Sequence, residues 1–139
     1  MTMKATIGSI ILGAHGGNSD ITDFAWSNST TEDAEQKGAS VKDVMTICGK
    51  IRVPKDDDHK SLELAQWSQV PPSSEDAYKE VSVECVDKNT VVRFVKFPNA
   101  FVVSYDEKFN VKGECIFELE VRQRGENLSE IEIEGNYPV

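Results

Sequence analysis

Short runs in which apolar and polar residues alternate recur along the whole chain. Val81, Val83 and Cys85 alternate with polar residues, and a longer run of the same kind ends at Gln123. Alternation with a period of two indicates strands that bury one face and expose the other. Turn residues separate the runs, so the sequence predicts about eight strands, at positions 4–12, 21–27, 44–53, 79–86, 90–97, 100–105, 113–123 and 128–134.

One segment has helical character. Residues 61–69 place Leu64 and Trp67 close together, and Val70 before two prolines ends the helix because the residue preceding proline avoids the helical region. Pro98 and Asn99 are expected to break the chain between two strands. The predicted fold is mainly β: an antiparallel β-barrel or two-sheet sandwich with one short packed α-helix. We expect a single domain over residues 1–139, because no linker divides the chain.

Residues 28–42 interrupt the pattern of strands. Its residues 29–40 include Ser, Thr, Glu, Asp, Gln and Lys but no large apolar residue, and they have no apolar period. Loops longer than about 12 to 15 residues in compact domains are usually functional or disordered. The sequence therefore predicts an extended, exposed loop at about 28–42.

The charge balance excludes two classes of partner. Fifteen Lys and Arg residues stand against 24 Asp and Glu residues, a formal net charge of −9. Nucleic acids require a basic surface, and anionic membranes attract basic segments, so we expect neither as a partner.

Gly8, Ser9 and Gly13 break the apolar stretch near the N-terminus, which suits a strand better than a signal peptide. We expect a cytoplasmic protein.

Residues capable of chemistry are few and scattered. His15 and His59 share no metal-ligand spacing with each other or with a cysteine, and residues 56–58 form an acidic turn that lacks the pattern of a calcium loop. The cysteines are an odd number without a Cys-x-x-Cys pair, which indicates buried free thiols, at Cys48, Cys85 and Cys115. We expect no catalytic residue, no metal and no cofactor.

Glutamates occupy the polar positions of the longest alternating run. Glu114, Glu118 and Glu120 lie opposite its apolar positions, and an acidic row recurs near the C-terminus. An acidic outer face keeps a strand soluble and discourages promiscuous pairing. The same face would suit the wall of a water-filled passage, and both interpretations stay open.

The order of elements from residue 62 to residue 134 resembles the Hcp family, the tube proteins of type VI secretion, and its relatives among phage tail-tube proteins. The resemblance rests on a helix with a Leu and Trp pair, a hairpin that begins at Tyr78, and a later aromatic segment. That segment reads Arg-Phe-Val-Lys-Phe-Pro-Asn-Ala-Phe-Val-Val-Ser-Tyr-Asp-Glu-Lys-Phe over residues 93–109. Residues 28–42 and the Pro71-Pro72 pair have no counterpart in the family pattern, so the machine that the chain serves stays open.

The resemblance implies a structural subunit that self-assembles into hexameric rings, which stack into the hollow tube of a contractile injection machine. Sheath, spike or cargo proteins would be its further partners. Strand faces would line the lumen, with Glu114, Glu118 and Glu120 as candidates. The extended loop would reach the next ring, with candidate residues Ser29, Thr30, Thr31, Glu32, Asp33, Glu35, Gln36 and Lys37.

Two alternatives follow from the same residues. A monomeric β-barrel that binds a small ligand or a peptide would use Trp26, Trp67 or Tyr105 to line a pocket. Most of these aromatic residues are better suited to a core. An enzyme would need His15 or His59 in a pocket, and no motif in the sequence points to one.

Overall fold

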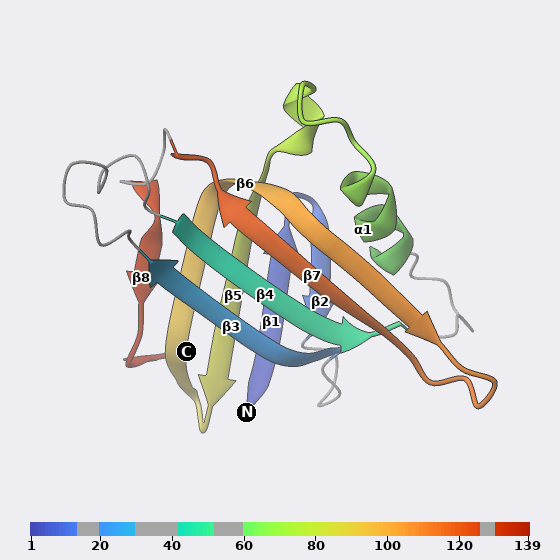
Figure 1. The fold of residues 1–139 in the computed structure, drawn as a ribbon. Coiled ribbons are helices and arrows are strands. Elements are labelled where there is room, and N and C mark those ends of the chain that lie inside the picture. The colour runs from blue at the N-terminus through green and yellow to red at the C-terminus, as the bar shows by residue number, and fades with distance from the viewer. Residues whose placement is uncertain (14–19, 30–41, 52–59, 126–129) are drawn as a thin grey trace.

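The computed structural model describes residues 1–13, 20–29, 42–51, 60–125 and 130–139. Nine antiparallel strands form one sheet with the order β2-β1-β5-β6-β7-β4-β3, and β8 and β9 pair with β6 beside that path. The sheet folds over as a sandwich and does not close into a barrel (Figure 1). The elements are β1 Thr2–Ile7, β2 Ile10–Gly13, β3 Ile21–Ser29, β4 Lys42–Lys50, α1 Lys60–Ser68, η1 Glu75–Ala77, β5 Lys79–Asp87, β6 Thr90–Phe109, β7 Cys115–Gln123, β8 Glu132–Glu134 and β9 Tyr137–Pro138.

The predicted first strand is a hairpin. β1 and β2 are joined at Gly8 and Ser9, and Ile7 pairs with Ile10 across the turn. Gly8 has a φ of 59°, a conformation that favours glycine. The single strand predicted over residues 4–12 was therefore wrong. Its apolar positions change from odd to even numbers across the turn, which lets both short strands bury the same face.

The break predicted at Pro98 and Asn99 was also wrong, because β6 runs through them as one strand of 20 residues. The first half of β6 pairs with β5 as far as Ala100, with a register shift between Phe97 and Ala100, and the second half pairs with β7 from Ala100 onward. Pro98 has no register partner on either strand, so its missing N–H removes no ladder hydrogen bond. β6 thus belongs to both layers of the sandwich, as Figure 1 shows.

One cluster of buried side chains fills the space between the layers. The predicted core positions of the alternating strands are confirmed: Val81, Val83 and Cys85 are buried, as are the inward residues of β7. Gly49 allows Phe117 to lie close to the backbone of β4, because a Cβ at Gly49 would come within 2.6 Å of the Phe117 ring. The inward residues of β7 are Phe117, Leu119 and Val121.

Helix α1 covers one open side of the sandwich. Leu64 and Trp67 are buried, as the sequence predicts, and the helix contacts β6 and β2. The indole N–H of Trp67 donates a hydrogen bond to the Ala77 carbonyl oxygen at 3.1 Å, which fastens η1 to α1. Within the described residues, no helix has the length and apolar character that a membrane crossing requires.

Candidate assembly surfaces

The second half of β6 forms a four-stranded layer with β7, β4 and β3, and the outward face of this layer carries the glutamates predicted to line a lumen. Glu118 and Glu120 lie on β7 with their side chains away from the buried residues. Cross-strand register places Asp106 and Cys48 beside Glu118, and Asp23 beside Cys48. This acidic row therefore crosses all four strands and consists of three carboxylates and the Cys48 thiol of β4.

Basic residues border this acidic row. Ile116 on β7 pairs with Lys50 on one side and Lys108 on the other. Arg122 occupies the outward position nearest the other end of β7. The outward face is therefore mixed in charge, with acidic residues concentrated in its middle. Sequence reasoning missed Lys50 and Lys108, because only strand register brings them beside β7.

Glu114 lies apart from the other two candidates. It precedes β7, in the connection between β6 and β7, where its carboxylate accepts a hydrogen bond from the side-chain amide of Asn110 at 3.1 Å. The structure thus brings Glu118 and Glu120 to one face and places Glu114 at the end of that layer.

The thiol of Cys48 lies within the acidic row. Partial burial is the main reason that the pKa of this thiol is raised, and the neighbouring carboxylates of Glu118 and Asp23 raise it further. A raised pKa keeps the thiol protonated at neutral pH, whereas a nucleophilic cysteine requires a lowered one. Cys48 and Cys115 are partly buried and Cys85 is buried, and all three are free. The expectation of free thiols is confirmed, with burial complete only at Cys85.

Two long edges of the four-stranded layer have no strand partner within the described residues. β3 pairs with β4 alone, and the second half of β6 pairs with β7 alone. Edge strands present unpaired backbone N–H and C=O groups that can pair with another chain. β3 ends the sheet with Phe24 and Trp26 packed against the core. These two edges are therefore candidate contact surfaces.

The segment predicted as an extended loop begins and ends in strands. Asn28 and Ser29 belong to β3 and Lys42 to β4, with Ser29 opposite Lys42. The Asn28 side-chain amide donates a hydrogen bond to the Asp43 carboxylate at 2.7 Å, so polar residues continue the ladder beyond the apolar run. Seven of the loop candidates lie outside the described residues: Thr30, Thr31, Glu32, Asp33, Glu35, Gln36 and Lys37.

The aromatic residues proposed for a ligand pocket belong mainly to the core. Trp67 is buried, and Lys79 lies over its ring at 5.9 Å. Tyr105 is half-buried and its hydroxyl donates to the Glu107 carboxylate at 2.7 Å. Burial raises the pKa of Tyr105 strongly, and the Glu107 carboxylate adds to the effect.

No cluster of three metal-ligating side chains occurs among the residues that the structure describes. His15, His59 and residues 56–58, which the sequence offered as candidates for chemistry, lie outside these residues.

Comparison with known proteins bears on the fold. No protein-family model matches the sequence, and no curated protein sequence matches it. Hcp1 from Flavobacterium johnsoniae superposes with a TM-score of 0.56 at 14% identity, covering 89% of this chain and 91% of Hcp1. A type VI secretion system effector from Yersinia pestis gives 0.59 at 13% identity, covering 99% of each chain. The chain has the Hcp-like tube fold.

The same fold occurs beyond type VI secretion. A chain of the sheath–tube complex of the extracellular contractile injection system PVC superposes with a TM-score of 0.55 at 12% identity, covering 96% of this chain and 88% of that chain. At such low identities the likeness concerns the fold alone. The resemblance inferred from residues 62–134 is thereby confirmed at the level of the fold, and it extends over nearly the whole chain.

Proposed function

We propose that the chain is a structural subunit that forms hexameric rings, which stack into the hollow tube of a contractile injection machine of the type VI secretion or phage-tail kind. The tube fold supports this role, because its neighbours are components of multi-subunit injection systems. No catalytic step is part of the proposal. Sheath, spike or cargo proteins are proposed as further partners, and the subunit would be made in the cytoplasm before export or incorporation into a particle.

The observation that carries the proposal is the pair of open edges on the four-stranded layer. β3 and β7 have nine residues each, and the stretch of β6 paired with β7 runs from Ala100 to Phe109. The two edges are therefore of similar length. Pairing of β3 in one copy with the second half of β6 in the next is a head-to-tail contact, and such a contact closes into a ring when its rotation permits.

In such a ring the outward face of the four-stranded layer would line the lumen. Glu118 and Glu120 would then project into the passage together with Asp106 and Asp23. This acidic band would repel polyanions. Glu114, at the end of the layer, would lie at the rim of the ring.

The segment 30–41 is proposed as a contact between stacked rings, within a single domain that spans the chain. Ser29 and Lys42 form the last pair of the β3–β4 ladder, so a two-residue turn can connect them directly. Replacing residues 30–41 with Asn-Gly should leave a folded subunit that forms rings but stacks poorly. Tubes of normal length from this variant would contradict the assignment of the loop.

The first experiment measures assembly of the unmodified chain. Light scattering after size exclusion should show a mass near six subunits, and negative-stain microscopy at high protein concentration should show rings or tubes. A monomer at every concentration, with or without a preformed baseplate to initiate assembly, would contradict the proposal.

A second experiment tests the edges. Changing Ala25 and Ser27 to Lys on the exposed positions of β3 should reduce the fraction of rings, because lysine on an edge strand opposes pairing. Thr2→Lys, at an exposed position of β1, is the matched control and should assemble normally. Equal loss of rings in both variants would indicate a general effect of charge and would contradict the assignment of β3 as a contact edge.

A further inference from the structure

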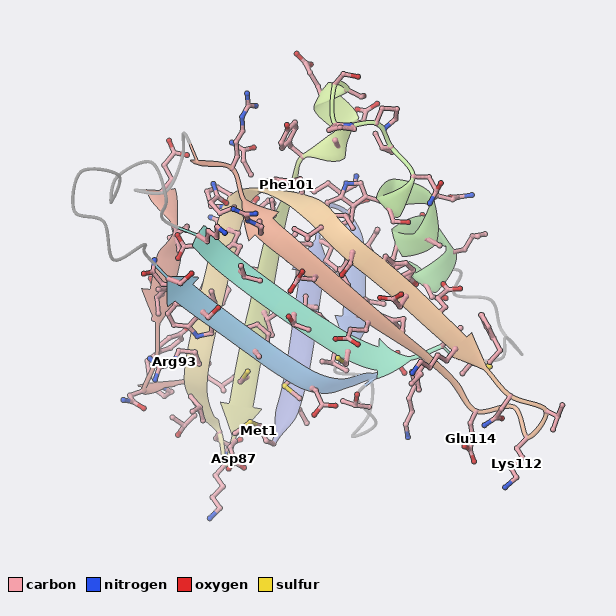
Figure 2. All side chains as sticks on the ribbon, in the orientation of Figure 1. Met1, Asp87, Arg93, Phe101, Lys112 and Glu114 are labelled. Atoms are coloured by element: carbon pink, nitrogen blue, oxygen red, sulfur yellow. The ribbon has the colours of Figure 1, made fainter. Side chains whose placement is uncertain are left out.

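The hairpin between β6 and β7 carries three exposed apolar side chains. Phe109 is 64% exposed, Ile116 is 47% exposed, and Val111 is fully exposed. Figure 2 shows Lys112 and Glu114 at the tip of this hairpin, which projects from the body of the sandwich. Exposed apolar side chains on a protruding element indicate a site of contact with another molecule.

The tip has a defined shape. The side-chain oxygen of Asn110 accepts hydrogen bonds from the backbone N–H groups of Lys112 and Glu114, each at 3.0 Å. The backbone N–H of Gly113 donates to the Asn110 carbonyl oxygen at 3.1 Å, and Gly113 has a φ of 82°. The tip is therefore ordered before any contact forms, which reduces the entropy lost on binding.

A hollow of about 420 Å³ lies at the opposite end of the same two strands. Its walls include the Tyr78 ring, with the Arg124 guanidinium 4.7 Å from the ring centroid and Phe101 packed edge-on at 6.1 Å. Two exposed acidic residues of η1 lie at the rim of the hollow: Glu75 lines it, and Asp76 is the next residue along η1. The hollow is lined by Pro72, Ser73, Ser74, Glu75, Tyr78, Asn99 and Arg124.

The positions of tip and hollow are related by the strands between them. β7 begins directly after the tip and ends at Gln123, next to Arg124 in the hollow. Its nine residues span about 30 Å at the usual rise of a strand. A second copy displaced by about this distance along the strands would bring its tip to the hollow of the first. The contact joins two different surfaces, so it can repeat from copy to copy.

We propose that the β6–β7 tip of one chain docks in this hollow of a second copy. Val111 would contact Pro72 and the Tyr78 ring, and the ammonium group of Lys112 would face Glu75 and Asp76. The positive charge of Lys112 at the tip is opposite to the negative charges of Glu75 and Asp76 at the rim, which favours a second copy of this chain as the occupant. The inference rests on the proposed tube and deepens it, because the contact would join successive rings.

Cysteine cross-linking tests the contact directly. In a chain carrying Cys48→Ser and Cys115→Ser, one variant receives Val111→Cys and another receives Ser73→Cys. Oxidation of their mixture under assembly conditions should give a cross-linked dimer, and a chain with both changes should give a ladder of multimers. The matched control pairs Val111→Cys with Lys88→Cys in the β5–β6 turn, whose side chain is also exposed, and should give no ladder.

Charge reversal provides a second measurement. Lys112→Glu should reduce the cross-linked product several-fold, and adding Glu75→Lys and Asp76→Lys to the partner should restore it. Rings and tubes visible by microscopy without the ladder would overturn the docking proposal while leaving the tube function intact. A ladder without rings or tubes would support the docking proposal and contradict the tube function. Equal ladders from the Lys88→Cys control would also overturn the docking proposal.

Discussion

The two layers of the sandwich end in different ways. The layer formed by β2, β1, β5 and the first half of β6 has short edges: β2 has four residues at one side, and β8 and β9 have three and two residues at the other. Within the described residues, the four-stranded layer ends in two long edges, β3 and the second half of β6. Short edge strands limit pairing with other chains, whereas long ones support it.

The first layer is also tied together on its outward face. The ammonium group of Lys96 on β6 lies 2.9 Å from the Glu80 carboxylate of β5 and 3.6 Å from the Glu132 carboxylate of β8. The Glu80 hydrogen bond is the main reason that the pKa of Lys96 is raised. The comparison indicates that the first layer completes the subunit and the four-stranded layer is available for assembly. The following predictions test this division.

The largest effect is expected where the layers share their core. Phe117→Ala should lower the free energy of unfolding by about 3–5 kcal/mol, because it leaves a cavity between the layers. Ile116→Ala, the exposed neighbour on the same strand, should change it by less than about 0.5 kcal/mol. Denaturant unfolding followed by fluorescence and circular dichroism measures both. Two separate transitions, one for each layer, would contradict a shared core.

A smaller loss is expected at Gly49. A Cβ there would approach the Asp20 carbonyl oxygen to 2.5 Å as well as the Phe117 ring, so Gly49→Ala should destabilise the chain by about 1–3 kcal/mol. Gly125→Ala is the matched control, since an added Cβ meets nothing within 4 Å. Thermal unfolding distinguishes the two, and equal stabilities would show that Phe117 can move away without loss.

The dependence of stability on alkaline pH should report on Tyr105, which lies in the second half of β6. Burial raises its pKa in the folded state above the ordinary value of about 10. Above that pH the unfolded chain loses a proton that the folded chain retains, so the free energy of unfolding falls as pH rises. Tyr105→Phe should make this fall shallower in urea titrations between about pH 9 and pH 11.

Tyr78→Phe is the control for that titration, because it removes a hydroxyl from a ring outside the four-stranded layer while keeping its contact with Phe101. An identical slope for Tyr105→Phe and the unmodified chain would show that Tyr105 ionises equally well in the folded state.

The smallest effect is expected at Lys96. Lys96→Met should increase amide hydrogen exchange in β8 without a measurable change in the midpoint of unfolding, because ion pairs between exposed groups contribute little. Ring formation should be unaffected, since β8 lies in the first layer. Loss of rings in Lys96→Met would contradict the proposal that only the four-stranded layer takes part in assembly.

The sequence predicts the faces of the strands well. Where an alternating run contains no turn, as in β5 and β7, the inward residues are those that the period of two indicates. Gly8 was underestimated as a turn because apolar residues continue on both sides of it. Pro98 was overestimated as a break because it lies at a register shift of the β5–β6 ladder, where no partner residue requires its backbone donor.

The sequence by itself determined the mainly β class, the short helix with Leu64 and Trp67, and the residues that fill the core, since these depend on local periodicity and burial. Tertiary structure alone decided which strands are neighbours. Register brings Lys50 and Lys108 beside Ile116, and it places Asp23, Cys48, Glu118 and Asp106 in one row. These contacts join residues far apart in the chain, and pairing between distant strands leaves no periodic signal in either one.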